Sequence, residues 1–478
     1  MRQVFILLIT LGIIPSILLF ADPDTATAQN WPQWRGPHST GAAPAGNPPV
    51  EWSEQQNIKW KTPLPGIGYS TPVVWNDIMY LTAAIPPEGS EAPAATQQRP
   101  QSSGAQQQGA RQQGARAQGG ARGQGQRAGR SGGSARRGGG GNATPTGPVK
   151  FLVMAIDRST GKILWEKQAR EEAPHEGKHR STTWATGSPI TDGEHIWAFF
   201  GSRGLFCYDL AGNLQWEKDF GDMQIRNAFG EGTTPRLYKN RLVVNWDHEG
   251  QSYIVVLGAK TGNEIWKKDR DERTTWMTPL VVEVAGKPQA ITAGKNKIIA
   301  YDLENGVIIW EAEGLTDNAI PSPMEADGVV YLTSGYRGNA MRAIRLSEAK
   351  GKVTGPPALL WSYDQDTPYV PSPLLLNGLM YFLKGNNGIL TCLDVATGQP
   401  LYSNQRLEGI SSMYASPTGV EDRVYLLSRD GVTMVVKHGS EFNVLATNTL
   451  DDNFDASPVI IGNEIYLRGH ESLYCITR

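Results

Sequence analysis

The sequence predicts an all-β protein: an eight-bladed β-propeller of four-stranded antiparallel blades, with the last blade closed by an N-terminal strand. Three observations predict this fold. A strand–turn–strand unit recurs along the chain, a Ser-Pro or Thr-Pro dipeptide recurs with it, and the last copy lacks a final strand that residues 57–62 can supply. A repeat of about 40–50 residues composed of short strands is typical of propellers, which have about four strands per blade.

The repeated hairpin is clearest at residues 151–167, FLVMAIDRSTGKILWEK. Asp157 can accept hydrogen bonds from the backbone of the turn, and Gly161 can adopt a positive φ without steric cost. One hairpin cannot bury its own apolar faces, so the copies must pack together. Further copies end at Lys218, Lys268 and Glu313, and weaker copies contain Trp361 and Tyr402.

The Ser-Pro and Thr-Pro dipeptides open the apolar run that begins each repeat. Their prolines are Pro72, Pro189, Pro235, Pro279, Pro323, Pro373, Pro417 and Pro458. After Pro189 the intervals are 46, 44, 44, 50, 44 and 41 residues. The first interval, of 117 residues, contains one blade and a low-complexity insertion, so the sequence predicts eight blades over residues 57–478.

Tryptophan recurs at one position of the hairpin. A large planar side chain at a fixed position can fill the wedge between twisted sheets, so we expect these residues to dock neighbouring blades rather than to stack on a ligand. They are Trp60, Trp165, Trp216, Trp266, Trp310 and Trp361.

Residues 1–28 have the pattern of a secretory signal peptide, with an apolar stretch after Arg2 and a small-residue cleavage site at Ala26-Thr27-Ala28. We expect cleavage before Gln29 and export to the periplasm or the exterior; an uncleaved anchor is the alternative. No cysteine precedes Cys207, so the N-terminus is not that of a lipoprotein. After cleavage no membrane-spanning segment is expected.

Residues 29–56 suggest an extended N-terminal arm. Trp31 and Trp34 stand beside prolines, and packing of these rings on the folded body is favoured over a sugar or partner site. Residues 86–148 are rich in Gln, Gly and Arg and lack the apolar side chains needed for a core, so we predict disorder. This insertion has eight arginines against two glutamates, a net charge of +6. A tolerated surface loop is favoured over contact with an anionic polymer or membrane, and export argues against specific nucleic-acid binding.

Known catalytic and metal motifs are scarce. The sequence has no GxSxG, HExxH, CxxC or P-loop motif, and we assign no catalytic residue. His175 and His179 with Glu176 resemble a metal cluster, but a chance pairing is favoured and no metal site is predicted. Cys207 and the other two cysteines, Cys392 and Cys475, fall in non-adjacent blades, so no disulfide is expected.

The loops before each dipeptide and the loops between the second and third strands meet on one face of a propeller. Charged and amide side chains are dense in them, and two readings remain: solvated loops, or a polar funnel that binds an envelope protein, a small molecule or a polymer. This group includes His175, His179, Glu231, Asp247 and Arg270. Trp184 and Trp276 lie near the same face and fit either packing or binding.

The repeat resembles the pyrroloquinoline quinone (PQQ) repeat, as in residues 188–218, SPITDGEHIWAFFGSRGLFCYDLAGNLQWEK. The resemblance covers residues 57–85 and 150–478 and implies the eight-bladed fold with the tryptophans as docking residues. Proteins with this repeat include quinoprotein dehydrogenases and non-enzymatic BamB-like proteins. The dehydrogenases carry a vicinal Cys-Cys pair and some carry CxxCH, both absent here, whereas BamB-like proteins are lipidated.

The sequence therefore favours an exported, monomeric, non-catalytic binding or scaffold module of the bacterial cell envelope. The alternative is a PQQ- and Ca²⁺-dependent dehydrogenase that oxidises an alcohol or sugar, and a third reading is a glycan-binding lectin. For a cofactor on the funnel, the resemblance implies a stacking tryptophan and a cationic partner. The candidates are Trp184, Arg226, Asn227, Arg273, Trp276 and Arg337.

Overall fold

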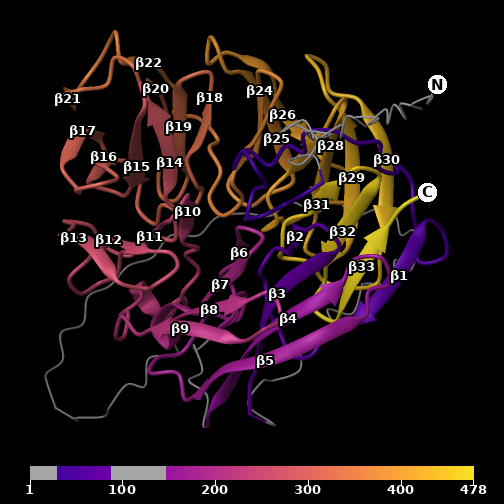
Figure 1. Ribbon diagram of the computed structural model, residues 1–478. Helices are drawn as coiled ribbons and strands as arrows, with labels where there is room; N and C mark the ends of the chain where they lie inside the picture. The colour runs from indigo at the N-terminus through magenta and orange to yellow at the C-terminus, as the bar shows by residue number, and fades with distance from the viewer. Residues whose placement is uncertain (1–28, 88–146) are drawn as a thin grey trace, which may run out of the picture.

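A computed structural model describes residues 29–87 and 147–478. Its strands form eight separate sheets around a central axis (Figure 1), as the sequence predicts. The predicted signal peptide and nearly all of the predicted insertion lie outside the described residues. Within them, no helix has the length and apolar character needed to span a membrane.

The blades are numbered here in chain order. Blade 1 consists of β2 (Val73–Trp75), β3 (Ile78–Ile85), β4 (Val149–Asp157) and β5 (Ile163–Glu172). Blade 2 consists of β6 (Ile190–Thr191), β7 (His195–Phe199), β8 (Leu205–Asp209) and β9 (Leu214–Lys218). Blade 3 consists of β10 (Arg236–Tyr238), β11 (Arg241–Trp246), β12 (Tyr253–Gly258) and β13 (Glu264–Asp269). Blade 4 consists of β14 (Leu280–Val284), β15 (Lys287–Ala293), β16 (Lys297–Asp302) and β17 (Ile308–Glu313), joined by β21 (Gly351–Val353).

The second half of the ring repeats the pattern. Blade 5 consists of β18 (Met324–Ala326), β19 (Val329–Ser334), β20 (Ala340–Arg345) and β22 (Leu359–Ser362). Blade 6 consists of β23 (Leu374–Leu376), β24 (Leu379–Leu383), β25 (Ile389–Asp394) and β26 (Pro400–Arg406). Blade 7 consists of β27 (Thr418–Val420), β28 (Arg423–Leu427), β29 (Val432–Lys437) and β30 (Val444–Thr449). Blade 8 consists of β31 (Val459–Ile461), β32 (Glu464–Arg468), β33 (Ser472–Ile476) and β1 (Ile58–Pro63). Two 3-10 turns, η1 (Gly201–Arg203) and η2 (Arg226–Ala228), lie in loops.

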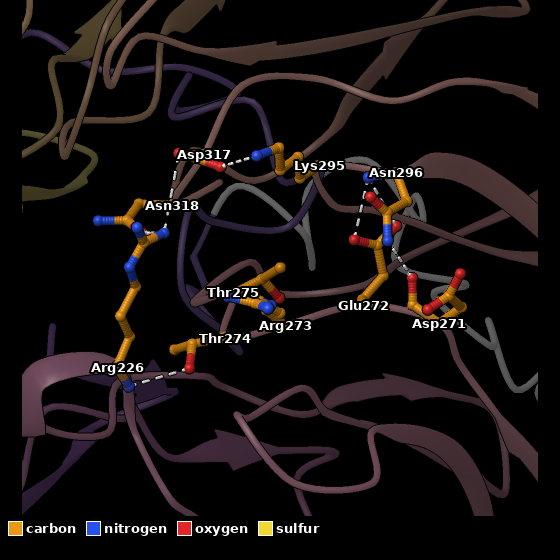
Figure 2. A pocket seen from close by; sticks show the side chains of 10 residues that line it. All are labelled: Arg226, Asp271, Glu272, Arg273, Thr274, Thr275, Lys295, Asn296, Asp317 and Asn318. Atoms are coloured by element: carbon orange, nitrogen blue, oxygen red, sulfur yellow. Dashed lines mark hydrogen bonds and ion pairs between the residues drawn. The ribbon is translucent and has the colours of Figure 1, made fainter.

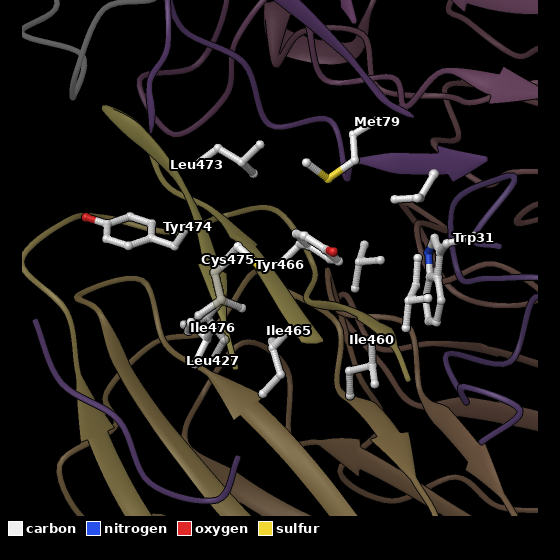
Figure 3. Packing of buried hydrophobic residues seen from close by; sticks show 14 of the residues in the cluster. Trp31, Met79, Leu427, Ile460, Ile465, Tyr466, Leu473, Tyr474, Cys475 and Ile476 are labelled. Atoms are coloured by element: carbon white, nitrogen blue, oxygen red, sulfur yellow. The ribbon is translucent and has the colours of Figure 1, made fainter. Parts of the chain in front are cut away.

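The two ends of the chain close the ring. Strand β1 pairs antiparallel with β33, with Trp60 opposite Cys475, and the indigo and yellow strands lie side by side in Figure 1. The N-terminal strand therefore supplies the outer strand of blade 8, which confirms the predicted closure. A cluster of buried side chains joins blades 7, 8 and 1 to the arm at this point (Figure 3); it includes Trp31, Met79, Leu427, Ile460 and Tyr466.

The recurring tryptophans contact the turn of the next blade. In five of them the indole N–H donates to a backbone carbonyl of that turn, over 2.8–3.1 Å. Trp266, for example, donates to Leu303, and its ring lies against Gly306 at φ +71°. Trp310 differs, because its indole donates to Gln289 of its own blade. There the hairpin of blade 5 is extended, and its inserted strand β21 pairs parallel with β17 beside Trp310.

This docking predicts unequal costs for two similar glycines. A Cβ at Gly306 would lie 2.7 Å from the Trp266 ring, whereas a Cβ at Gly328, at a similar φ of +74°, would meet nothing within 4 Å. Gly328→Ala should lower the free energy of unfolding by about 1 kcal/mol through backbone strain alone. Gly306→Ala should cost about 2 kcal/mol more because it overpacks the interface between blades. Chemical denaturation of both variants measures the difference, and equal losses would show that the docking contact contributes nothing.

The Ser-Pro and Thr-Pro dipeptides form a hydroxyl ring around the axis. Except at Thr234, the backbone N–H of each Ser or Thr donates to the side-chain hydroxyl of the Ser or Thr in the next blade, over 2.9–3.2 Å. Seven such hydrogen bonds link successive blades, including Ser457 to Thr71 across the closure. The ring members are Thr71, Ser188, Thr234, Thr278, Ser322, Ser372, Ser416 and Ser457.

The N-terminal arm enters the central channel beyond this ring. Its backbone bonds to inner strands of blades 1, 6 and 7, with Trp31 paired to Val74 in β2 and Ala43 bonded to Gly419 in β27. Arg35 is 2% exposed, and its guanidinium donates to the carbonyls of Thr40, Pro373 and Pro417. The arm therefore ties opposite sides of the ring together from inside.

Candidate functional site

A cavity of about 360 Å³ lies on the axis, bounded by the loops that lead into the inner strands. We call it the central cavity. Hydroxyl and aromatic side chains from all parts of the ring line it. They include Thr71, Ser188, Thr234, Thr278, Ser416 and Ser457 from the hydroxyl ring, and Tyr69, Phe229, Trp276, Tyr336, Tyr369 and Tyr414 from the loops.

Trp34 of the arm also lines the central cavity. Because the rest of the arm bonds to the inner strands beyond the hydroxyl ring, Trp34 forms the floor and the loops form the mouth. The predicted packing role of the arm thus holds for Trp31, which is 1% exposed, while Trp34 both packs and faces the cavity.

The aromatic walls are held in place by the protein. The Trp276 indole N–H donates to the carbonyl of Gly230 over 2.7 Å, which fixes the ring plane. Tyr336 and Tyr369 stack on each other with ring centroids 4.8 Å apart. Because protein groups already contact one face or edge of each ring, only the remaining face or edge is available to a ligand.

Cations surround one side of the mouth. Burial and then the charges of Arg180, Arg429 and Lys178 lower the pKa of His179. The Arg429 guanidinium lies 4.2 Å from the Tyr414 ring centroid and pairs with Asp455 over 2.6 Å. Arg180, Lys178 and Arg429 therefore lie near this side of the cavity, where Asp455 offsets the charge of Arg429.

Glu231 is one of two acidic residues that line the central cavity. Its carboxylate accepts hydrogen bonds from the backbone N–H of Ser202 (2.6 Å) and from the Ser202 hydroxyl (2.5 Å). Burial raises the pKa of Glu231 to about 7 and outweighs those hydrogen bonds, with Glu176 adding to the rise. Glu231 therefore keeps its proton to a higher pH in the folded protein than in the unfolded chain.

Replacing Glu231 by glutamine should remove part of the pH dependence of stability. A folded pKa near 7 above an unfolded value of 4.5 gives a stabilising contribution that is complete below pH 4.5 and lost as the pH rises through 7. The wild-type free energy of unfolding minus that of Glu231→Gln should thus fall by about 1–3 kcal/mol between those pH values. Urea titrations across that range measure it, with the exposed Glu166→Gln as control. A flat difference would contradict the burial of the acid.

A second pocket, of about 440 Å³, lies between the loops of blades 3, 4 and 5 (Figure 2). We call it the ionic pocket. Lys295 Nζ lies 2.7 Å from an Asp317 oxygen, and Arg226 bonds to Asn318 over 3.2 Å while lying 3.9 Å from Asp317. The Lys295 contact, with Arg226 and Arg337, lowers the pKa of Asp317. Asn318 also bonds to the Tyr369 hydroxyl over 3.5 Å, which connects the two cavities.

The structure separates the sequence-derived candidates. Arg226 and Arg273 share the ionic pocket, where the Arg273 side chain is 77% exposed, whereas Trp276 lines the central cavity. Arg337 lies over the Tyr336 ring at 5.2 Å. Trp184 lines two smaller cavities beside Glu231 and lies under Lys178, while Asn227 adopts a positive φ within η2.

One expectation for the funnel residues needs correction. Asp247 and Arg270, which the sequence groups with the funnel loops, have fully buried side chains that form an ion pair of 2.8 Å. They lie at strand ends that neighbouring blades cover. His175 and His179, for which the sequence favours a chance pairing, lie apart: His179 faces the central cavity, whereas His175 lies near Glu176 and Glu231.

The cluster of His175, Glu176 and Glu231 brings three ligand-type atoms within 4.8 Å of one another. Each side chain already has protein partners. His175 Nε2 lies 2.6 Å from the Met223 carbonyl, Glu176 accepts from Ile225, and Ser202 occupies both oxygens of Glu231. Sequence reasoning missed Glu231 as a neighbour of His175 because the two residues lie in different blade connections.

Solved structures of other proteins have a similar fold. BamB from Moraxella catarrhalis is similar over 70% of this chain and 92% of its own, with 14% identity and a TM-score of 0.52. A europium-containing methanol dehydrogenase is similar over 94% of this chain and 98% of its own, with 10% identity and a TM-score of 0.60. The quinohemoprotein alcohol dehydrogenase from Comamonas testosteroni is similar over 95% and 81%, with 12% identity and a TM-score of 0.58. At these identities the likeness concerns the fold.

No curated protein matches the chain significantly in sequence. The sequence model of the family described as outer membrane protein assembly factor BamB matches residues 50–229 and 250–478. These matches span most of the chain and leave only β10 and β11 of blade 3 outside them among the strands of the eight blades. The chain therefore belongs to this family of PQQ-like β-propellers.

Proposed function

We propose that this protein is an exported, non-catalytic binding module of the cell envelope, and that its ligand enters the central cavity. The observation that carries the proposal is the cavity itself: aromatic rings and hydroxyls line it, and Trp34 closes it at one end. Its volume of about 360 Å³ lies within the usual range for small-molecule sites, about 300–1,000 Å³. An envelope protein on the same loops is a second form of partner that this surface could hold.

The family description and the similarity to BamB support a binding role in the envelope. The signal-like residues 1–28 support export, and the mature protein should begin at Gln29 when its N-terminus is sequenced. The chain acts as a monomer in this proposal, since the cavity is complete within one ring.

The similarity to quinoprotein dehydrogenases raises the question of whether PQQ with Ca²⁺ fits here. Calcium takes about 6–8 oxygen ligands, several of them carboxylates. Most carboxylates that line the two cavities are already engaged: Asp317 by Lys295 and Arg226, Asp455 by Arg429 and His470, and Glu231 by Ser202. Glu272 accepts from backbone N–H groups, which leaves the exposed Asp271 of the ionic pocket, a single carboxylate where Ca²⁺ needs several. The described residues therefore do not fit a Ca²⁺–quinone site.

A fluorescent probe tests whether the central cavity binds ligands. The anionic aromatic probe 1-anilinonaphthalene-8-sulfonate should bind the mature protein with enhanced fluorescence, because the cavity offers aromatic walls and cations near its mouth. Ile320→Trp should abolish most of this signal, since Ile320 lines the cavity and a larger side chain fills it. Ile308→Trp is the matched control on the 51% exposed Ile308 of β17. Equal probe binding by both variants would contradict the proposed site.

A further inference from the structure

We propose that the ligand of the central cavity is a carboxylated saccharide, a sugar ring that carries a uronic acid group. This inference rests on the proposed binding function and names the class of its ligand. Three features of the described residues carry it: unused hydroxyl donors, the engaged state of the nearby acceptors, and aromatic walls with cations near the mouth.

The hydroxyl ring supplies donors that point to one place. The Oγ atoms of Ser188, Thr234, Ser416 and Ser457 each accept a backbone N–H from the preceding blade, and Thr71 closes the ring in the same way. A hydroxyl that accepts one hydrogen bond still carries its own hydrogen. Within residues 29–87 and 147–478, no protein acceptor takes the hydrogens of these five hydroxyls. The cavity thus presents several O–H donors around one axis.

The acceptors beside the cavity are, by contrast, occupied. Asp455 accepts from Arg429 Nε over 2.6 Å, from Arg429 Nη2 over 3.0 Å and from His470 over 2.9 Å. Both oxygens of Glu231 are held by Ser202. A site with spare donors and engaged acceptors selects a ligand rich in oxygen acceptors, as a carboxylated sugar is.

The charge at the mouth agrees with an anion. Arg180 and Arg337 form no ion pair with any carboxylate of the described residues, and Arg429 exerts its charge on His179. Lys178 adds to the same field. These cations would attract a carboxylate on the ligand as it enters the cavity, whereas they would repel a cationic ligand.

The aromatic rings favour a sugar over a flat aromatic ligand. Tyr336 stacks on Tyr369, and Tyr69 stacks on His470 at 4.9 Å, so the protein itself already fills one face in each pair. A pyranose needs only one apolar face against one ring, which Trp276 supplies, while its hydroxyls reach the donors around it.

Calorimetric titration with digalacturonate tests the inference. Wild-type protein should bind it, and the same disaccharide with both carboxylates reduced to hydroxymethyl groups should bind at least ten-fold more weakly. Trp276→Ala should lower the affinity for digalacturonate at least ten-fold. Trp184→Ala, a matched tryptophan in the loop before blade 2 that does not line the central cavity, should change it less than three-fold. Thermal melting of both variants verifies that they remain folded.

The outcomes separate this inference from the function on which it rests. Probe binding that Ile320→Trp abolishes, together with no heat from digalacturonate, would overturn the ligand class and leave the binding site standing. Equal affinity for the reduced disaccharide would overturn the role of the carboxylate. Tight binding of PQQ without Ca²⁺ in the same titration would assign the cavity to a flat anion instead.

Discussion

Replacing Asp247 with asparagine should lower the free energy of unfolding by about 3–5 kcal/mol. The Asp247 carboxylate accepts two hydrogen bonds from Arg270, at 2.8 and 3.2 Å, and one from Thr275, in a site where both charged side chains are fully buried. Burial alone would lower the pKa of Arg270, but Asp247 outweighs that effect and raises it. The asparagine keeps the volume and removes the charge, so Arg270 is left as an unpaired buried cation.

Loss of this ion pair should weaken two blades at once, because the pair connects blade 3 to blade 4. Asp247 follows β11 in blade 3, and Arg270 also bonds to the Tyr301 hydroxyl of blade 4 over 3.2 Å. Glu311→Gln is the matched control, because it removes one carboxylate from the exposed ion pair with Lys297 and should cost less than about 1 kcal/mol. Urea denaturation compares the two. Similar small losses would show that water reaches the Asp247 site.

Arg35→Ala should be of comparable size, about 3 kcal/mol or more. Three carbonyls, two of them on the residues that lead into β23 and β27, would lose their donor inside the channel. Burial lowers the pKa of Arg35 to about 9, and no carboxylate of the described residues pairs with it, so its desolvation opposes this stabilisation. The prediction is that the three hydrogen bonds and the filled volume outweigh that cost.

Two further variants make the Arg35 prediction specific. Gly41→Ala would place a Cβ 2.1 Å from Arg35 Nη2, and it should therefore displace the guanidinium without removing it. Arg406→Ala, on an exposed arginine of β26, should change stability by less than about 0.5 kcal/mol. Denaturation and limited proteolysis of the arm measure the effects. If the Arg35→Ala protein is as stable as wild type, then the arm does not stabilise the ring through Arg35.

The fold could be predicted because each blade carries its own local signals. The Ser-Pro or Thr-Pro dipeptide opens every blade, the docking tryptophan recurs in six of the eight blades, and the missing last strand indicates closure. The exception is Trp310, where the inserted β21 replaces the usual contact. The sequence shows an extended turn there, but parallel pairing with another blade depends on where that blade lies.

The site was predictable only in part, since it depends on how eight blades are placed relative to one another. Trp276 faces the central cavity, yet Trp184, in the corresponding loop before blade 2, does not line it. The sequence does not show the hydroxyl ring, because its bonds join residues from 41 to 386 positions apart. Asp247 resembles a surface loop residue in the sequence because its partners Arg270 and Thr275 lie 23 and 28 positions further along the chain.

Whether the cavity is a plain binding site or a quinone site can be measured most directly by melting the mature protein with PQQ, in the presence and absence of Ca²⁺. A ligand at 100 times its Kd stabilises a folded protein by about 2.7 kcal/mol. Because Asp317, Asp455 and Glu231 are already engaged by protein groups, Ca²⁺ should add no stabilisation to that seen with PQQ alone. A clear rise in melting temperature that requires both PQQ and Ca²⁺ would contradict the binding-module assignment and indicate a dehydrogenase.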